Sequence, residues 1–599
     1  MKLPSPASIT RHTTVVLRRF PLQVLLCLIA VIAACWLVEV DYKQYLVINS
    51  LKKLLAICNV CFIFLLAGDI FAETYGQHPA KRWLIRLAIL LGGILLFYVL
   101  QPHFYQSDTY ILILLAIAGH LLLSFIPFVR QGDTTAFWQF NKILFLRILT
   151  SIFYTLVLFI GLAIALFAVD HLFSLDLREK YYQNLFFILG IGFNTLFFLA
   201  GVPTQIPSLA KYADYPKGLK IFTQYVLIPL MGIYLLILLS YELKIIIDWE
   251  LPKGIVSNLI IGYAFFGILS LLLIFPIRSQ EGHTWIQLFS RFFYFTMVPL
   301  LVLLGLATYK RINYYGITEL RYFLLVLACW LTFITVYFLV SKGQHIKLIP
   351  LSLCLCTLFA IYGPQSASSI SKNSQIARLK RLMPQSDRAA NMEKGSIIRY
   401  LVNHHGLTAL QSFTKRDLTA LEHHFNQEND TLASYMLDKQ KLDTAFALLS
   451  VDPNQSYQNT KSYSVSTSNA GVTDVKGWNY LVLLDNYQRE RKVMIGKDSM
   501  TITMGDDNRH LDIQIGKNHM AIKLDSIIGA IDKAYEHKQL VSQKGGENHY
   551  YYPQEKMQFM KTIGSYTIGV FVTDITIYSY FTHSKETTNS SFRATILLK

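Results

Sequence analysis

Long apolar runs follow one another along the first 365 residues, and they constrain this chain more than any other feature. A helix needs about 20 apolar residues to cross a hydrocarbon core roughly 30 Å thick. Eleven segments fit this requirement closely enough to be predicted as membrane-spanning helices. They are residues 20–40, 54–72, 83–100, 109–129, 148–170, 183–201, 220–243, 255–276, 292–309, 320–341 and 346–362.

The eleventh segment follows the tenth after only the short loop Ser341–His345. These two segments could also form a hairpin that does not fully cross the bilayer, so both alternatives stay open. Composition supports the membrane interpretation, because only 16% of the 599 residues are charged, whereas soluble domains average about 25%. The net charge of +17 belongs mostly to the membrane part, which argues against nucleic acid and for the lipid bilayer as partner.

The distribution of Lys and Arg in the short loops predicts the orientation, because cytoplasmic loops are enriched in both. Loops on the N-terminal side contain 17 of these residues, against 10 in the opposite loops. The N-terminus is therefore expected in the cytoplasm. An odd number of spans then places the C-terminal domain outside the cytoplasm, which in a Gram-negative cell means the periplasm, and a miscount by one span would reverse that side.

The charge balance of the chain becomes ordinary near its last third, which predicts three parts. Residues 1–365 form a multi-span helical domain, residues 366–395 a basic juxtamembrane linker, and residues 396–599 a soluble α+β domain. Helical patterns cover 396–402, 415–425, 431–449 and 526–537, and residues 453–471 are rich in Ser, Asn and Gln and predict a loop. Alternating runs at 478–484, 491–495, 500–504, 511–515, 520–524, 556–562, 566–572, 575–581 and 591–598 predict an antiparallel sheet.

Five short motifs occur in order along the membrane half: Phe137–Lys142, Phe198–Pro203, Tyr241–Lys244 with Trp249–Gly254, Gly316–Tyr322 and Ser369–Gln375. Together they resemble the polytopic family called domain of unknown function 4153, over roughly residues 15–385. The resemblance implies a bacterial inner-membrane protein of unassigned activity. It supplies no catalytic residues.

Ionisable residues inside a span are functional-site candidates, because burying them in hydrocarbon is costly. Asp69 and Glu73 form an i,i+4 pair near the end of the second span and could bind a cation or relay protons. They could equally pair with Lys81, Arg82 or Arg86 near the membrane edge. His120 lies deeper, in the fourth span, and Asp170 and His171 close the fifth. These five residues are the candidate intramembrane polar site.

The motifs of known catalysts are scarce in this sequence. It contains no phosphate-binding GxxxxGK[ST] loop, no HExxH and no GxSxG. Cys58 and Cys61 lie mid-span and are interpreted as packing residues. His404, His405, His423 and His424 are interpreted as surface histidines, and Ser369–Lys372 as a chance match to S-x-x-K. We therefore predict no catalytic residues, metal ligands or cofactor, and the sequence gives no basis for an enzyme.

Two functions stay open from the sequence. The first is an envelope sensor or scaffold whose periplasmic domain has an envelope protein as partner. The second is a small-molecule or ion transporter that uses polar residues within the helical bundle. A transporter of repeat architecture should show paired broken helices, and the break at Pro203–Pro216 has no counterpart in the other half. A continuous polar cavity among the spans would distinguish the two functions.

Overall fold

The chain forms two compact units in a computed structural model, one of Met1–Gln385 with Glu393–Val451 and one of Ser386–Met392 with Asp452–Lys599. The structure describes residues 14–41, 43–100, 105–130, 133–211, 215–248, 255–277, 284–341, 345–428, 434–451, 462–467, 475–484, 490–504, 510–542, 548–582 and 585–599. The expected domain boundary at residue 396 stays a prediction, while compactness groups residues 393–451 with the helical bundle.

Ten helices in the described part of the first unit are long and apolar enough to cross a membrane. They are α2 (Pro21–Glu39), α3 (Tyr45–Thr74), α4 (Pro79–Val99), α5 (Gln106–Phe125) with η1 (Ile126–Phe128), α6 (Thr134–Phe173), α7 (Glu179–Phe187) with η2 (Ile188–Phe193) and α8 (Asn194–Ala200), α9 (Lys217–Phe222) with η4 (Thr223–Leu227) and α10 (Ile228–Asp248), α11 (Ile255–Ile274), α12 (Thr284–Tyr315) and α13 (Glu319–Val340). A short 3₁₀ segment, η3 (Ile206–Lys211), lies between α8 and α9.

Large apolar side chains cover much of the outside of these helices, as at Leu84, Leu95 and Val340. Such a surface would be unfavourable in water and is suited to lipid. The bundle interior is closely packed, since a Cβ at Gly93 would lie 2.3 Å from the Cys61 sulfur. Cys61 and Cys58 are both buried. The chain is thus a multi-pass helical membrane protein.

The fifth span is longer than expected. Helix α6 runs unbroken from Thr134 to Phe173, with the Asp133 carboxylate accepting hydrogen bonds from two amides of its first turn. At 40 residues it is about 60 Å long. The aromatic segment at its start packs inside the bundle, and Phe137, Trp138 and Phe140 are buried.

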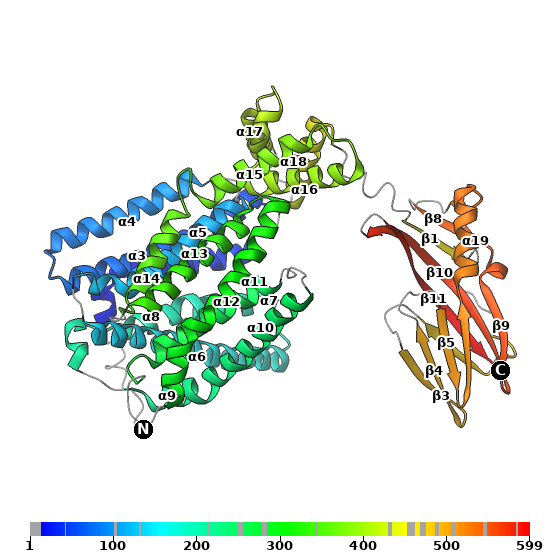
Figure 1. The fold of residues 1–599 in the computed structure, drawn as a ribbon, viewed down its shortest axis with the longest axis horizontal. Helices are drawn as coiled ribbons and strands as arrows, with labels where there is room; N and C mark the ends of the chain where they lie inside the picture. The colour runs from blue at the N-terminus through cyan, green and yellow to red at the C-terminus, as the bar shows by residue number, and fades with distance from the viewer. Residues whose placement is uncertain are drawn as a thin grey trace. The chain divides into compact units, whose positions relative to one another are not determined.

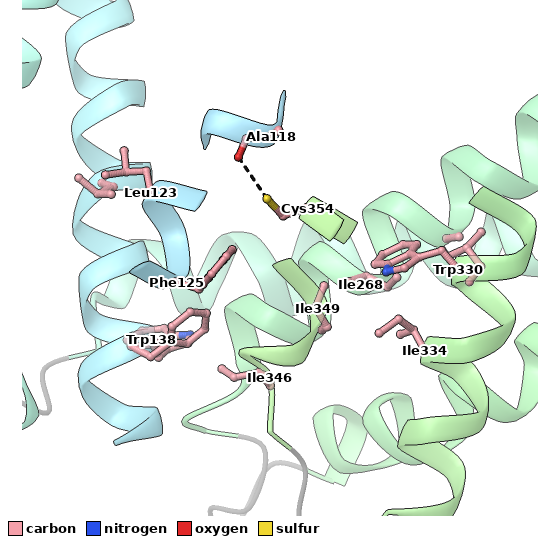
Figure 2. Close-up of a cluster of buried hydrophobic side chains, with 14 of the residues drawn as sticks. Ala118, Leu123, Phe125, Trp138, Ile268, Trp330, Ile334, Ile346, Ile349 and Cys354 are labelled. Atoms are coloured by element: carbon pink, nitrogen blue, oxygen red, sulfur yellow. Dashed lines mark hydrogen bonds between the residues drawn. The ribbon is translucent and has the colours of Figure 1, made fainter. Parts of the chain in front are cut away.

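The eleventh segment contains a helix of only 12 residues, α14 (Leu348–Phe359), which at about 18 Å is too short to span by itself. Its residues nevertheless contact the α5–η1 segment in antiparallel order. The Lys347 ammonium donates to the Phe128 carbonyl (2.8 Å), and the Cys354 thiol to the Ala118 carbonyl (3.5 Å; Figure 2). The Tyr322 hydroxyl, near the start of α13, then donates to the Gln365 carbonyl (2.5 Å). Residues 346–366 therefore connect the two ends of the bundle.

The segment after α14 forms a helical layer that we call the cap (Figure 1). It consists of α15 (Ala367–Leu382), α16 (Arg388–His405), η5 (Leu407–Phe413), α17 (Leu418–Glu428) and α18 (Ser434–Leu449). Its core includes Leu379, Ile398, Leu401 and Leu407, all fully or nearly fully buried. Part of the predicted basic linker 366–395 is helix α15, whose Ser371, Gln375 and Leu379 are buried.

The second unit is rich in β-structure. Its strands are β1 (Ser462–Thr467), β2 (Tyr480–Leu484), β3 (Glu490–Ile495), β4 (Asp498–Met504), β5 (His510–Ile515), β6 (Asn518–Lys523), β7 (Val541–Ser542), β8 (His549–Tyr552), β9 (Gln558–Ile563), β10 (Tyr566–Thr582) and β11 (Lys585–Leu598). Helix α19 (Asp525–Glu536) and η7 (Gln554–Lys556) complete it. The predicted fold class, a polytopic helical membrane protein followed by an α+β domain with antiparallel sheet, is confirmed.

The strands form two sheets with one shared apolar core. The larger follows the order β2-β11-β10-β1-β8-β7, with β9 also paired to β10, and the smaller follows β3-β4-β5-β6 (Figure 1). All pairs are antiparallel except β1 with β8. The turns between β3 and β4 and between β5 and β6 use glycines at positive φ, Gly496 (58°) and Gly516 (57°), a conformation that costs glycine little.

The sequence expectation differs from this unit in three respects. Strands β7 and β8 were not expected. Strand β1 lies inside the segment expected to be a loop, and it is a central strand of the larger sheet. Two expected strands, 566–572 and 575–581, are one strand, β10, with a register shift between Val572 and Asp574. The residues 505–509 between two of the expected strands and the motif Trp249–Gly254 lie outside the described residues.

Candidate functional site

Asp69 and Glu73 lie on the last turns of α3 and are surrounded by arginines. The Asp69 side chain is fully buried and accepts hydrogen bonds from Arg82 Nε (2.8 Å), from Arg86 Nε (2.8 Å) and from Arg86 Nη2 (3.0 Å). The Gln23 amide donates a further bond to Asp69 (2.8 Å). Glu73 pairs with Arg19 (2.8 Å) and Arg82 (3.1 Å).

We call Arg19, Asp69, Glu73, Arg82 and Arg86 the arginine–carboxylate cluster. Arg19 also donates to the carbonyls of Val202 and Pro203, both at 2.7 Å. The cluster thus joins the start of α2, the end of α3, the start of α4 and the loop after α8. Three guanidinium groups face two carboxylates, so the excess charge is positive. This geometry favours the salt-bridge interpretation over a cation site, and it adds Arg19, which lies 54 positions from Glu73.

His120 lies apart from this cluster, on the wall of a cavity of about 440 Å³. Residues of α2, α3, α5, α6 and the α7–α8 segment line it. We call it the polar cavity, because seven of its lining side chains can form hydrogen bonds: Cys27, Cys58, Asn59, His120, Ser151, Asn194 and Thr195. Asn59, near the middle of α3, and His120 are both exposed. Polar side chains at this depth need a polar environment.

Hydrogen bonds orient several of these groups. His120 Nδ1 contacts the Ala116 carbonyl (2.8 Å), and because a carbonyl can only accept, a neutral ring keeps Nε2 as an acceptor. Ser151 Oγ donates to the main-chain carbonyl of Asn194 (2.9 Å) and also contacts its side chain. The Cys27 thiol donates to the Ile191 carbonyl (3.4 Å). The cavity therefore presents an amide, an imidazole, hydroxyls and thiols.

The wall of the polar cavity contains an irregular helix. Ile191 belongs to η2, a π-helical stretch of six residues (Ile188–Phe193) between α7 and α8. A π-helix leaves the regular i→i−4 ladder and is frequently found at functional sites. Asn194, the first residue after this stretch, carries one of the polar side chains of the cavity. The local irregularity places main-chain and side-chain polar groups side by side at membrane depth.

Asp170 and His171 lie elsewhere, at the far end of α6, and neither lines the polar cavity. Asp170 Oδ1 accepts from the Leu177 amide (2.8 Å), which stabilises the turn where Ser174 takes φ 51°. His171 stacks on Phe167, with centroids 6.1 Å apart. Of the five predicted site residues, the structure brings together only Asp69 and Glu73.

The sequence analysis missed a polar junction between the bundle and the cap. Tyr105, which precedes α5, hydrogen-bonds to Glu422 of α17 and accepts from the Lys441 ammonium of α18 (3.2 Å). Lys441 also pairs with Glu422 (3.7 Å), and its side chain is only 1% exposed. Burial lowers the pKa of Lys441, while Glu422 and Asp438 act in the opposite direction.

A second group at the same junction contains residues expected at the surface. His404 Nδ1 lies 2.7 Å from Glu319 Oε2, a carboxylate that is 1% exposed. His405 contacts Ser368, and burial lowers the pKa of His405 to about 3, with His404 and Lys372 acting in the same direction. The surface interpretation was wrong for this pair, because the end of α16 that carries it packs against Glu319 at the start of α13. His423 and His424, in contrast, are exposed.

Two of the sequence motifs, Gly316–Tyr322 and Ser369–Gln375, contact each other at this junction. Their presence in the sequence is the signal that could have located it. The Ile317 amide donates to Ser374 Oγ (2.9 Å). The Gln375 amide donates to the carbonyls of Tyr315 (3.1 Å) and Ile317 (3.0 Å). Gly316 between them takes φ +68°, and a Cβ there would lie 3.0 Å from the Gln375 side chain. The motifs thus join the start of α13 to α15.

A membrane bundle with a polar cavity and a docked helical cap defines the class of this protein. The chain belongs to the family described as Domain of unknown function (DUF4153), which matches residues 25–385, more than half of it. It is also 28% identical over 308 residues to Uncharacterized protein PM1469 of Pasteurella multocida (strain Pm70), a match covering 50% of each protein. The chain thus spans about half the length of that relative. No solved structure matches.

Proposed function

We propose that this protein is a membrane transporter that binds a small hydrogen-bonding solute in the polar cavity. The observation that carries the proposal is the exposure of Asn59 and His120 to one cavity at the depth of the spans. In hydrocarbon each polar group would lack hydrogen-bond partners, so such residues face a bundle interior or a water-filled space. Binding sites of transporters lie near the bilayer midplane in segments of irregular helix.

The lining of the polar cavity suggests the class of solute. None of the lining residues is a carboxylate, Lys or Arg. A bare cation would find none of the carboxylate ligands that it prefers, and a strongly anionic solute would find no fixed positive charge. We therefore propose an uncharged polar solute held by amide, hydroxyl and imidazole groups, with apolar contacts from residues such as Phe62 and Phe198.

Cysteine labelling tests this proposal. In a variant without the seven native cysteines, we expect Asn59→Cys and His120→Cys to react with a charged methanethiosulfonate reagent in intact cells. The lipid-facing control Leu91→Cys on α4, which is exposed, should react at least about tenfold more slowly, because a charged reagent does not enter hydrocarbon. Equal, slow labelling at all three positions would mean that the cavity is dry, and the transport proposal would be abandoned.

A sensor or scaffold in the cell envelope is the second candidate function. The bundle–cap junction favours it, because buried charges such as Glu319 and Lys441 couple the cap to the ends of α5 and α13. The sheet-rich unit has an apolar core of its own and would bind an envelope protein as partner. In this function the polar cavity would bind a regulatory solute without moving it across the membrane.

We infer that the protein lies in a bacterial inner membrane with its N-terminus in the cytoplasm and its C-terminal domain in the periplasm. The loop charges support this orientation, as do eleven passages through the bundle, ten long helices and the α14 segment. Alkaline phosphatase fused after Lys599 should then be active, and a fluorescent protein that folds only in the cytoplasm should stay dark. A truncated control fusion after Arg130 should give the reverse, and fluorescence after Lys599 would refute the orientation.

A further inference from the structure

A second cavity of about 440 Å³ lies between α5, α6, α11, α13 and α14, and it shares no lining residue with the polar cavity. Its walls are almost entirely apolar. Figure 2 draws part of this wall, with Trp138 of α6, Trp330 of α13, and Ile268, Ile346 and Ile349. We call it the apolar cavity.

The polar groups in its wall are engaged within the protein. The Trp138 indole donates to the Leu272 carbonyl (2.7 Å), and the Trp330 indole donates to Ser352 Oγ (2.9 Å). The Asn141 amide donates to the carbonyls of Ser124 (3.0 Å) and Phe137 (2.9 Å). Ordered water needs about two to four polar partners, and this wall instead suits a hydrocarbon chain.

One cation lies on the lining of the apolar cavity. Lys142 is the single charged residue among those that line it, and its ammonium lies 5.3 Å from the centre of the Trp138 ring. Lys142 belongs to the first turns of α6, close to the end of the bundle that contains the arginine–carboxylate cluster. Tyr75, which follows α3, donates to the carbonyl of Pro127 in η1 (3.0 Å), so the end of α3 and the segment that leads into α6 lie side by side. A lysine near the end of a membrane-spanning helix can extend its ammonium to the headgroup layer.

The cavity borders the outer surface of the bundle at Phe265. Phe265, one of its lining residues, is 63% exposed on the outside of α11, whereas Ala264 and Ile268 on the inner face are buried. A chain that enters beside Phe265 comes from lipid, because the outer surface of α11 is apolar at Phe265 and Phe266. The occupant that matches an apolar chamber with a single cation is therefore an amphiphile with an acyl chain and an anionic head.

We propose that the apolar cavity is a specific binding site for one acyl chain of an anionic phospholipid whose phosphate pairs with Lys142. The site is independent of the solute proposed for the polar cavity, so either proposal can fail alone. Lys142 supplies the charge preference, and the chamber between Trp138 and Trp330 supplies the affinity for the chain. The polar cavity cannot replace it, because its wall carries hydrogen-bonding groups at mid-depth.

Native mass spectrometry of the full-length protein in a mild detergent tests this site, with dioleoyl phosphatidylglycerol and dioleoyl phosphatidylcholine as probes. We expect one phosphatidylglycerol to be retained in preference to phosphatidylcholine. Lys142→Gln should weaken phosphatidylglycerol binding about fivefold, which corresponds to one lysine near a membrane surface, and should leave phosphatidylcholine unchanged. Ala264→Leu fills the cavity and should weaken binding of both lipids.

Matched control variants separate this site from general lipid adhesion. Lys217→Gln removes an exposed charge at the start of α9, and Gly262→Leu places a leucine side chain on α11 at a position where a Cβ meets no atom within 4 Å. Both should bind phosphatidylglycerol as the unmodified protein does. Equal retention of the two lipids, or a Lys142→Gln variant indistinguishable from Lys217→Gln, would overturn the proposal. Lys142 is partly exposed, so its variant tests the site even if Ala264→Leu fails to fold.

Discussion

Asp69→Asn is expected to lower the free energy of unfolding of the membrane bundle by about 3–5 kcal/mol, the cost of removing one partner from a buried ion pair. Asparagine keeps the shape of the side chain but loses its charge. Arg86, whose side chain is 6% exposed, then loses the carboxylate that lies 2.8 Å from its Nε. Arg82 keeps Glu73 as a partner, so most of the cost is expected to arise at Arg86.

Thermal or denaturant unfolding in detergent measures this effect. The matched control is Glu39→Gln, which breaks the exposed pair Lys180–Glu39 and should cost at most about 1 kcal/mol. Adding Arg86→Met to Asp69→Asn removes the unpaired charge and should restore part of the stability, because the two residues are in direct contact. If Asp69→Asn were no worse than Glu39→Gln, the salt-bridge interpretation would be wrong, and an ion or proton site at Asp69 and Glu73 would regain support.

Glu422→Gln is expected to release the cap from the bundle, with a loss of about 3–5 kcal/mol in the stability of their contact. Lys441 is 1% exposed, with Glu422 at 3.7 Å and the Tyr105 hydroxyl at 3.2 Å, and Asp438 also favours its charged form. The variant leaves a buried ammonium without this carboxylate. Because burial already lowers the pKa of Lys441, the variant should deprotonate it more readily. As pH rises through the lowered pKa, the charge disappears and the defect becomes smaller.

Hydrogen–deuterium exchange of the amides in α17 and α18 measures cap release. Exchange in the Glu422→Gln variant should be faster than in the unmodified protein, and the difference should be larger at pH 6 than at pH 9. Glu490→Gln, which breaks an exposed pair with Lys492 in the sheet-rich unit, is the control and should leave cap exchange unchanged. Unchanged protection in the Glu422→Gln variant would show that apolar packing alone holds the cap.

The candidate site could be predicted from the sequence only in part. Asp69 and Glu73 are recognisable because charges stand out in an apolar run, and Arg82 and Arg86 follow closely enough to be foreseen as partners. Arg19 was not foreseen, because it lies 54 positions from Glu73 and depends on how α2 packs against α3. Asn59 was missed because an amide in a long apolar span looks like an ordinary interhelical contact. Its importance appears only when it shares a cavity with His120.

The junction shows the same limit. Tyr105 and Glu422 are separated by 317 positions, and neither residue is unusual in its own segment. In the sequence, His404 looks like a residue at the end of a surface helix. Only the packing of the cap on the bundle places it next to Glu319. Contacts of this kind require long-range chain closure and packing, and local patterning carries no information about either.

The sequence by itself determined the membrane-spanning helices and most strands, because hydrophobic length and alternation are local properties set by the bilayer and by a half-buried sheet. It did not determine β1, whose alternating Ser and Tyr or Val residues read as a loop. Val465 and Tyr463 are buried because β10 and β8 pair with β1 on either side. Likewise the sequence left open whether residues 346–362, which contain α14, cross the bilayer or form a hairpin. Only the antiparallel packing of α14 along α5 decides that this segment connects the two ends of the bundle.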